Sequence, residues 1–439
     1  MTKFHAVLVG SVAEDHHVIA VMRQHKDSFT WEHVQYTGSA NCDLDALAKR
    51  HPMLAQAEVV IGGGEAVIDD ALLQLMPRAR VCTQMAVGYN GVDLQAAERR
   101  GCWVCNAPVC ALREATADSA LTLMLNAMRR MRPGLQLALN EAGSAKGWDY
   151  KTMRAIIGDS PQGQTLGIIG LGRVGQALAY KARLAFGMRV IYYDVVREPP
   201  IRTPEYVPSY RDRVAVAPPL AVAMGTNNGN GGAGSSLCSC DWQPLDKLLR
   251  EADVVSLNCN LTPHNAGMMG AAEFGAMKAG SYFVNAARGG LVDEAALAGA
   301  LGPGGRLAGA GLDVFVDEPR IKPELLSRPN VFVMPHLSSA TRGCRVAMAQ
   351  RMIHNALRVV RDGKAPANPL NQPAAAVQKL DELERVRVAK YIHDEFAAVR
   401  TASSVTKIQH QQQQRRWQTR KVVALSVAVS VAFCALHHN

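Results

Sequence analysis

The stretch Gln164–Asp194, QTLGIIGLGRVGQALAYKARLAFGMRVIYYD, decides the fold of this chain. It opens with an apolar run, Thr165–Ile169, which has the composition of a strand buried on both faces of a parallel sheet. A glycine-rich turn and a helix-like segment follow, and then a second apolar run, Arg189–Tyr193. Strand, glycine turn, helix and strand in this order predict a βαβ unit of a dinucleotide-binding Rossmann domain.

The three glycines of the turn each have a physical task in such a unit. We expect Gly170 to make the tight turn, Gly172 to let a pyrophosphate approach the backbone, and Gly175 to let the helix lie close to the strand. The helix would then present free N–H groups and the positive end of its dipole to the phosphates. A glycine-rich turn without a ligand is the alternative, and the strand on either side argues against it.

Asp194 closes the second strand of the unit, about 20 residues after Gly175. A carboxylate at this place accepts a hydrogen bond from a ribose 2′-OH and repels a 2′-phosphate. We therefore predict NAD, as NADH, to be the cofactor. NADPH is the less favoured alternative, because Arg197 lies close to Asp194 in the sequence.

Composition places the chain among ordinary globular proteins of two or three domains. It has 439 residues, of which 48% are hydrophobic and 20% charged, and a net charge of +10. Half of that charge lies in residues 379–421, which hold ten Lys or Arg and five Asp or Glu. No aromatic residues are interleaved with a basic patch, so we expect no nucleic-acid partner.

Ten cysteines include a single CxxC spacing, Cys102–Cys105, and no second pair that would complete a zinc site. We therefore expect reduced thiols and no metal. The N-terminus has no hydrophobic segment followed by a cleavage site, so we predict a protein that is not secreted. It would be cytosolic or organellar, with the peroxisome or mitochondrion as alternatives, although the chain has no SKL-type ending.

The rest of the chain divides around the Rossmann unit. Residues 1–108 form an α/β lobe with expected strands at Ala6–Val9, Val59–Ile61 and Val81–Thr83 and a helix at Val67–Leu75. Residues 109–335 form the nucleotide domain, which begins with a helix at Glu114–Met131 and carries an inserted loop at about 197–243. Residues 336–371 return to the first lobe through a helix at Thr341–Arg361.

Residues 372–439 form a basic tail of low complexity. We expect a helix with mixed charge at 375–410, followed by a glutamine run and the basic segment RRWQTRK. The segment 422–436, VVALSVAVSVAFCAL, is uncharged but shorter than the roughly 20 residues that span a bilayer. Its basic flank predicts a C-terminal membrane anchor with the catalytic domain in the cytosol; a packed terminal helix or strand, or an inaccurate gene boundary, are the alternatives.

Three polar residues stand at or just beyond the ends of three predicted strands: Arg288, Glu318 and His336. In a doubly wound sheet, ligands bind at the carboxyl ends of the strands, so we expect these side chains to meet there. Reduction of a carbonyl by hydride requires a proton, which a histidine supplies near neutral pH. A carboxylate beside a histidine orients its ring, and an arginine fork grips a 2-oxoacid.

Three sequence motifs, NAARGGLVDEAAL, GLDVFVDEP and RPNVFVMPHLSSAT, resemble the D-isomer-specific 2-hydroxyacid dehydrogenases. The resemblance runs from about Val59 to Asn371. It implies a two-lobed α/β fold in which the Rossmann domain is inserted into a flavodoxin-like substrate-binding domain, and it implies a homodimer. In that family, the residues that match Arg288, Glu318 and His336 are the catalytic set.

The resemblance also implies binding residues. The backbone at Val87 and Gly88 matches the loop that receives the substrate carboxylate, together with Arg288. The expected cofactor contacts are Gly170, Gly172, Arg173, Val174, Gly175, Asp194, Cys259, Ala286, Arg288 and Asp313. Two departures stand in one strand motif, where the family's common histidine and proline are Asn258 and Asn260.

Within the family, MAVGYNGVDLQAAERRG and GLDVFVDEPRIKPEL resemble plant-type hydroxypyruvate reductases. Hydroxypyruvate and glyoxylate are therefore the expected substrates, each reduced by NADH to the D-2-hydroxyacid. One alternative is a corepressor-like protein that binds NADH to set its assembly state, because GRVGQA and NAARGGLVDE resemble those proteins too. Another is a phosphoglycerate dehydrogenase, although the tail does not resemble its regulatory domain.

Overall fold

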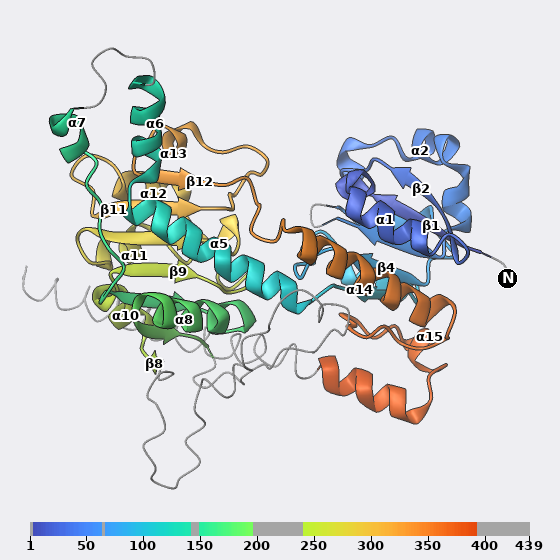
Figure 1. Ribbon diagram of the computed structural model, residues 1–439. Helices are drawn as coiled ribbons and strands as arrows, with labels where there is room; N and C mark the ends of the chain where they lie inside the picture. The colour runs from blue at the N-terminus through green and yellow to red at the C-terminus, as the bar shows by residue number, and fades with distance from the viewer. Residues whose placement is uncertain (1–2, 64–65, 142–148, 196–239, 393–439) are drawn as a thin grey trace, which may run out of the picture.

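The computed structural model describes residues 3–63, 66–141, 149–195 and 240–392. These residues form two α/β lobes, each built on a parallel sheet (Figure 1). The sheet of the first lobe has the order β2-β1-β3-β4-β5. Its strands are β1 Phe4–Val9, β2 Phe29–Val34, β3 Val59–Gly62, β4 Val81–Gln84 and β5 Trp103–Cys105. This is the flavodoxin-like order, as predicted.

The sheet of the second lobe has the order β12-β11-β10-β9-β6-β7-β8, and every pair of neighbours is parallel. Its strands are β6 Thr165–Ile169, β7 Arg189–Tyr193, β8 Asp241–Trp242, β9 Val254–Leu257, β10 Ser281–Asn285, β11 Leu307–Leu312 and β12 Val331–Val333. The order runs outward in both directions from the β6–β9 pair. That pair is the topological switch point at which a doubly wound sheet binds its ligand.

Helices cover both sheets, and aspartate side chains cap several of them by accepting backbone N–H groups of the first turn. The first lobe carries α1 His16–Gln24, α2 Leu44–Arg50, α3 Asp70–Gln74, α4 Leu94–Arg99, α14 Arg342–Val360 and α15 Ala374–Val377. The second carries α6 Met131–Glu141, α7 Tyr150–Arg154, α8 Arg173–Phe186, α10 Leu245–Glu251, α11 Ala271–Ala276, α12 Glu294–Ala300 and α13 Pro323–Leu326. The 3₁₀ turns are Gly10–Glu14, Ser39–Asn41, Pro52–Gln56 and Gly289–Leu291.

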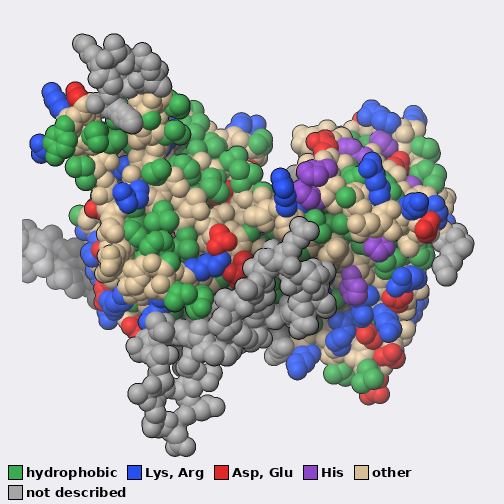
Figure 2. Space-filling model, in the orientation of Figure 1, with side chains coloured by type: hydrophobic (Ala, Val, Ile, Leu, Met, Phe, Trp, Pro, Cys, Tyr) green, Lys and Arg blue, Asp and Glu red, His purple; other side chains and the backbone are tan. Residues whose placement is uncertain are grey.

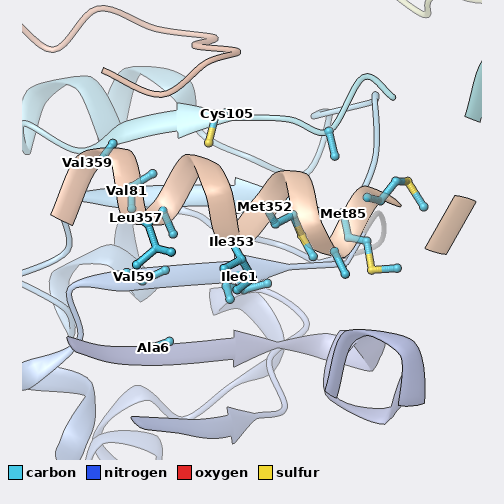
Figure 3. Packing of buried hydrophobic residues seen from close by; sticks show 14 of the residues in the cluster. Ala6, Val59, Ile61, Val81, Met85, Cys105, Met352, Ile353, Leu357 and Val359 are labelled. Carbon is cyan, nitrogen blue, oxygen red and sulfur yellow. The ribbon is translucent and has the colours of Figure 1, made fainter. Parts of the chain in front are cut away.

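Two long helices join the lobes. Helix α5, Cys110–Met128, packs its first turn on the core of the first lobe, and from Ala117 onward its apolar face lies in the core of the second. Helix α14 lies across the first sheet, where Met352 and Ile353 pack among Val59 and Ile61 (Figure 3). The chain therefore leaves the first lobe through α5 and returns to it through α14, as the predicted insertion requires.

Several boundaries differ from the sequence expectation. Helix α5 begins at Cys110 rather than at Glu114, and it ends at Met128 because Arg130 adopts a left-handed backbone conformation that separates it from α6. Helix α3 is shorter than Val67–Leu75, because the Asp69 side chain caps its start by accepting the Leu72 N–H.

The predicted loop at 197–243 holds a strand at its C-terminal end. Strand β8 pairs in parallel with β7, with Ile191 opposite Asp241 and Tyr192 opposite Trp242. A strand of two residues has too little pattern to be read from sequence. Residues 196–239 of the predicted loop, with Arg197, lie outside the described residues.

The first part of the predicted tail belongs to the first lobe. The expected helix at 375–410 is interrupted after α15, and a second helical segment covers 382–392. Leu380 and Val388 are buried in the core beneath α14, and Glu384 pairs with Arg358 of that helix at 3.1 Å. The predicted anchor at 422–436 lies outside the described residues. Among the described residues, no helix is both long and apolar enough to cross a membrane.

Candidate active site

The three predicted catalytic residues follow three neighbouring strands of the second sheet. Arg288 comes after β10, Glu318 after β11 and His336 after β12. Because parallel strands point the same way, their carboxyl ends place these residues along one edge. The structure brings them together: His336 Nδ1 lies 2.7 Å from Glu318 Oε2, and the Glu318 carboxylate acts electrostatically on Arg288.

Glu318 holds the histidine ring in one orientation. One carboxylate oxygen accepts the Phe315 N–H at 2.9 Å, and the other faces His336 Nδ1. Nδ1 therefore carries the proton of that bond, which leaves Nε2 as the ring nitrogen that can face a substrate. The His336 side chain is 48% exposed, so a small molecule can reach it.

The Glu318 carboxyl is stabilised in its ionised form. Burial raises its pKa, but hydrogen bonds from His336 and the Phe315 N–H, with the positive charges of His336 and Arg288, outweigh burial. The net result is a pKa below the ordinary glutamate range. Glu318 therefore acts as a fixed negative charge beside the imidazole at neutral pH.

Arg288 reaches from the second lobe to the predicted substrate loop of the first. Its Nη1 donates to the Ala287 carbonyl at 2.6 Å, and a Cβ atom added at Gly88 would overlap its guanidinium. Burial lowers the pKa of Arg288, and the negative charge of Glu318 opposes that shift. Arg288 and the backbone at Val87 and Gly88 thus share one small space, in which a carboxylate would meet both.

Asn106 fixes this loop, and sequence analysis assigned it no role. The side chain lies at the end of β5, is 3% exposed, and donates from Nδ2 to the Val87 carbonyl at 2.8 Å. In turn, Asn355 of α14 donates to the Asn106 carbonyl at 3.3 Å. The only sequence signal was a polar residue at the end of an apolar strand, just before Pro108.

The glycine-rich turn has the geometry of a phosphate cradle. Gly172 is the N-cap of α8, and a Cβ atom added there would meet no atom of the described residues within 4 Å. Gly170 has a φ of +96°, and a Cβ there would lie 2.8 Å from the Cys259 backbone nitrogen. A Cβ at Gly175 would overlap the Gly170 carbonyl. Space around Gly172 at the N-terminus of α8, with close packing at Gly170 and Gly175 that tolerates only glycine, fits a dinucleotide pyrophosphate.

Other predicted cofactor contacts surround this cradle. Arg173 and Val174 open α8, and Ala286 follows β10. Asp194 accepts the Leu171 N–H at 2.7 Å, which fixes its carboxylate beside the glycine turn. Cys259 lies against Gly170 of the turn. Burial and the nearby charge of Asp194 raise the pKa of its thiol to about 12, so the thiol is neutral.

Asn258, which stands where the family has histidine, follows the end of β9 and precedes Cys259. Its Nδ2 donates to Ser256 Oγ at 3.1 Å, while its buried Oδ1 accepts no hydrogen bond from any described residue. Asp313, another predicted contact, has a side chain that is turned away from solvent. It is fully buried, and its carboxylate accepts backbone N–H groups of the loop that follows His336.

Comparison with known proteins agrees with this geometry. The sequence matches the D-isomer specific 2-hydroxyacid dehydrogenase, NAD binding domain, over residues 121–217 and 226–338. It is 36% identical over 312 residues to a glyoxylate reductase of Thermococcus gammatolerans, which covers 71% of this chain and 82% of that protein. The chain belongs to the D-isomer-specific 2-hydroxyacid dehydrogenase family.

Two further relatives are similar to most of the chain. A glyoxylate/hydroxypyruvate reductase B of Klebsiella pneumoniae is 33% identical over 341 residues, 77% of this chain and 93% of that protein. The crystal structure of an NADPH-dependent glyoxylate/hydroxypyruvate reductase from Sinorhizobium meliloti, in complex with NADP and malonate, has a TM-score of 0.64 and 25% identity, and covers 85% of this chain and 98% of that one. As a member of this family, the protein is an NAD-binding oxidoreductase. The resemblance to plant-type enzymes in particular stays a prediction.

The lowered pKa of Glu318 predicts how the rate of the reaction depends on pH. Its folded-state pKa is depressed, so its charge is present at and above the ordinary glutamate range and is lost only as pH falls through the lowered value. Glu318→Gln removes the counter-charge of the protonated imidazole. We expect kcat/KM for 2-oxoacid reduction to fall by about 10²-fold, and the acid limb that reflects protonation of Glu318 to disappear, in initial-rate profiles.

Glu324→Gln, an exposed change in the nearby helix α13, is the matched control and should leave both the rate and the profile unchanged. A Glu318→Gln profile that superimposes on that of the wild type would contradict the role given to this carboxylate.

Proposed function

We propose that this protein reduces glyoxylate and hydroxypyruvate with NADH and releases the corresponding D-2-hydroxyacids. The observation that carries the proposal is the convergence of the Glu318–His336 pair with Arg288, and of Arg288 with Gly88, at the carboxyl edge of the second sheet. The names of the Thermococcus, Klebsiella and Sinorhizobium relatives support these substrates.

The chain's own residues divide the work of the reaction. Arg288 and the N–H groups at Val87 and Gly88 bind the substrate carboxylate, and the guanidinium polarises the neighbouring carbonyl. His336 donates a proton to the carbonyl oxygen, and Glu318 stabilises the imidazolium before that transfer. When bound, the nicotinamide supplies the hydride. The glycine turn, Asp194 and Cys259 would hold the dinucleotide.

NADH is the proposed cofactor because Asp194 is anchored beside the phosphate cradle. Its hydrogen bond from the Leu171 N–H holds a negative charge where the adenosine ribose is bound in this fold. A 2′-phosphate placed there would meet that charge. The Sinorhizobium structure contains NADP, so both cofactors belong in any assay.

Removing the proton donor tests the mechanism. We expect His336→Ala to lower kcat for hydroxypyruvate or glyoxylate by about 10²- to 10⁴-fold, because no other described group is placed to donate the proton. NADH binding, measured by fluorescence titration, should be unchanged. His25→Ala, at the end of α1, is the control and should retain full turnover. Full turnover in His336→Ala would overturn the mechanism.

We also propose that the protein is a homodimer. Helix α6 presents an apolar stripe in which Met131, Leu135 and Leu139 are 53%, 60% and 66% exposed, and α7 adds Tyr150 and Met153. Apolar side chains gather at this end of the second lobe in Figure 2. A stripe at i, i+4 and i+8 lies on one helix face, and a second copy related by a two-fold axis would cover it with the same surface.

The double substitution Leu135→Glu with Leu139→Glu tests this interface. Burying two carboxylates without partners is unfavourable, so we expect the variant to elute as a monomer when its mass is measured by light scattering. Leu383→Glu is the control, because Leu383 is 84% exposed on the other lobe and lies outside the stripe. A wild-type protein that is monomeric at micromolar concentration would contradict the proposal.

A further inference from the structure

Glu294, the first residue of α12, carries a buried carboxylate. Its side chain is 4% exposed, although glutamate side chains ordinarily lie in solvent. A carboxylate away from water requires hydrogen bonds or an opposite charge. Its two partners among the described residues are the Val316 N–H, whose nitrogen lies 2.8 Å from Oε1, and the Lys322 ammonium, whose Nζ lies 3.6 Å from Oε2.

Both partners belong to the loop that carries Glu318. This loop covers residues 313–322, between the end of β11 and the start of α13, and contains no helix or strand. Val316 lies two residues before Glu318 and Lys322 four residues after it, so Glu294 binds the loop on both sides of Glu318. The Lys322 side chain is 46% exposed, and water screens its charge. The hydrogen bond from Val316 is therefore the main contact.

The loop also rests on the turn that follows Arg288. A Cβ atom added at Gly289 would overlap the Phe315 carbonyl, so the two backbones are in direct contact there. The Phe315 N–H in turn donates to Glu318 Oε1 at 2.9 Å. Residues 288–294 thus contact the glutamate loop twice, through the backbone of Gly289 and through the side chain of Glu294.

We propose that Glu294 is a positioning residue, which fixes the loop 313–322 and thereby sets where the Glu318 carboxylate stands beside His336. Because the Glu318–His336 pair transfers the proton in the proposed function, the role of Glu294 rests on that function. Packing does not hold the loop at Val316, whose own side chain is 53% exposed. Without the Glu294 oxygen, the Val316 N–H would lose its acceptor, and the residues that lead to Glu318 would lose their link to α12.

Two variants of similar length separate the hydrogen bond from the charge in the full chain. Glu294→Gln keeps an oxygen that accepts the Val316 N–H, and Glu294→Met has none. We expect Glu294→Met to lower kcat for the 2-oxoacid by about 10- to 100-fold, as a displacement of about 1 Å in a catalytic group does. Glu294→Gln should stay within about threefold of the wild type, because its hydrogen bond remains. An unchanged Kd for NADH shows that each variant is folded.

The pH profile of kcat/KM shows whether the loss comes through Glu318. Burial raises the pKa of Glu318, but hydrogen bonds from His336 and the Phe315 N–H, with the charges of His336 and Arg288, hold it below its ordinary range. A loosened loop weakens these contacts, so the pKa of Glu318 rises and its charge is lost at a higher pH. The acid limb should therefore move to higher pH in Glu294→Met and stay in place in Glu294→Gln.

A double-mutant cycle gives a second test of the same link. In a Glu318→Gln background, Glu294→Met should cause little further loss of kcat, because the carboxylate that it positions is already absent. Glu273→Met is the matched control. Glu273 lies in the first turn of α11 and accepts the Gly270 N–H at 3.1 Å, which is the same kind of bond at another helix start. This variant should leave kcat and the pH profile unchanged.

Unchanged kcat in Glu294→Met, equal losses in Glu294→Gln and Glu294→Met, or additive losses in the cycle would overturn the positioning role. Should Glu294→Met not fold, Glu294→Ala repeats the kinetic test. Hydrogen exchange at the Val316 amide of the wild type needs no variant: it should be slow, and exchange as fast as in an unfolded peptide would contradict the bond to Glu294. If the wild type reduces no 2-oxoacid, the proposed function fails, while this exchange still shows whether Glu294 holds the loop.

Discussion

The hydrogen bond between Glu318 and His336 joins two loops that follow different strands, so it exists only where both loops are fixed. Buried polar side chains fix them. Asp313 accepts the N–H groups that follow His336, and Glu294 of α12 accepts the Val316 N–H at 2.8 Å, two residues before Glu318. Each of these two carboxylates replaces water as the acceptor of a backbone N–H at a strand end. Losing such a charge-assisted hydrogen bond inside the protein would cost stability.

Buried polar side chains also fix the loops at the substrate end of the site. Asn285 accepts the Ala287 N–H and donates to the Arg288 carbonyl, so the arginine loop is also tied to its strand. Asn106 does the same for the loop at Val87. The two lobes meet where Arg288 faces Gly88, and only a residue without a side chain leaves room there for the guanidinium. Side chains that touch no substrate thereby set the geometry of those that do.

The parts of the structure that could be predicted from sequence are those whose sequence signals lie within a few residues of one another. The spacing of Gly170, Gly172 and Gly175 after an apolar run predicted β6, α8 and β7, because each glycine answers a steric demand within a few residues. Polar residues just beyond apolar strands indicated Arg288, Glu318 and His336. Their convergence then followed from the parallel sheet order alone.

The parts that sequence reasoning missed depend on distant contacts. Strand β8 is two residues long and exists because β7 offers it an edge. Residues 372–392 were assigned to a tail because the family resemblance ends near Asn371, yet Leu380 and Val388 belong to the core that α14 covers. The hydrogen bonds of Asp313 could not be read from a motif, because the N–H groups after His336 lie about 24 residues away in sequence and follow the neighbouring strand.

A spectrophotometric assay measures the proposed reductase activity directly. Purified full-length protein would be mixed with NADH and, in parallel, with hydroxypyruvate, glyoxylate or pyruvate, and the loss of NADH absorbance followed; the series would be repeated with NADPH. The structure predicts rapid oxidation with hydroxypyruvate or glyoxylate, faster with NADH than with NADPH. If NADH binds tightly but none of these 2-oxoacids oxidises it, the proposed reductase activity is contradicted, and a protein that senses the cofactor is favoured.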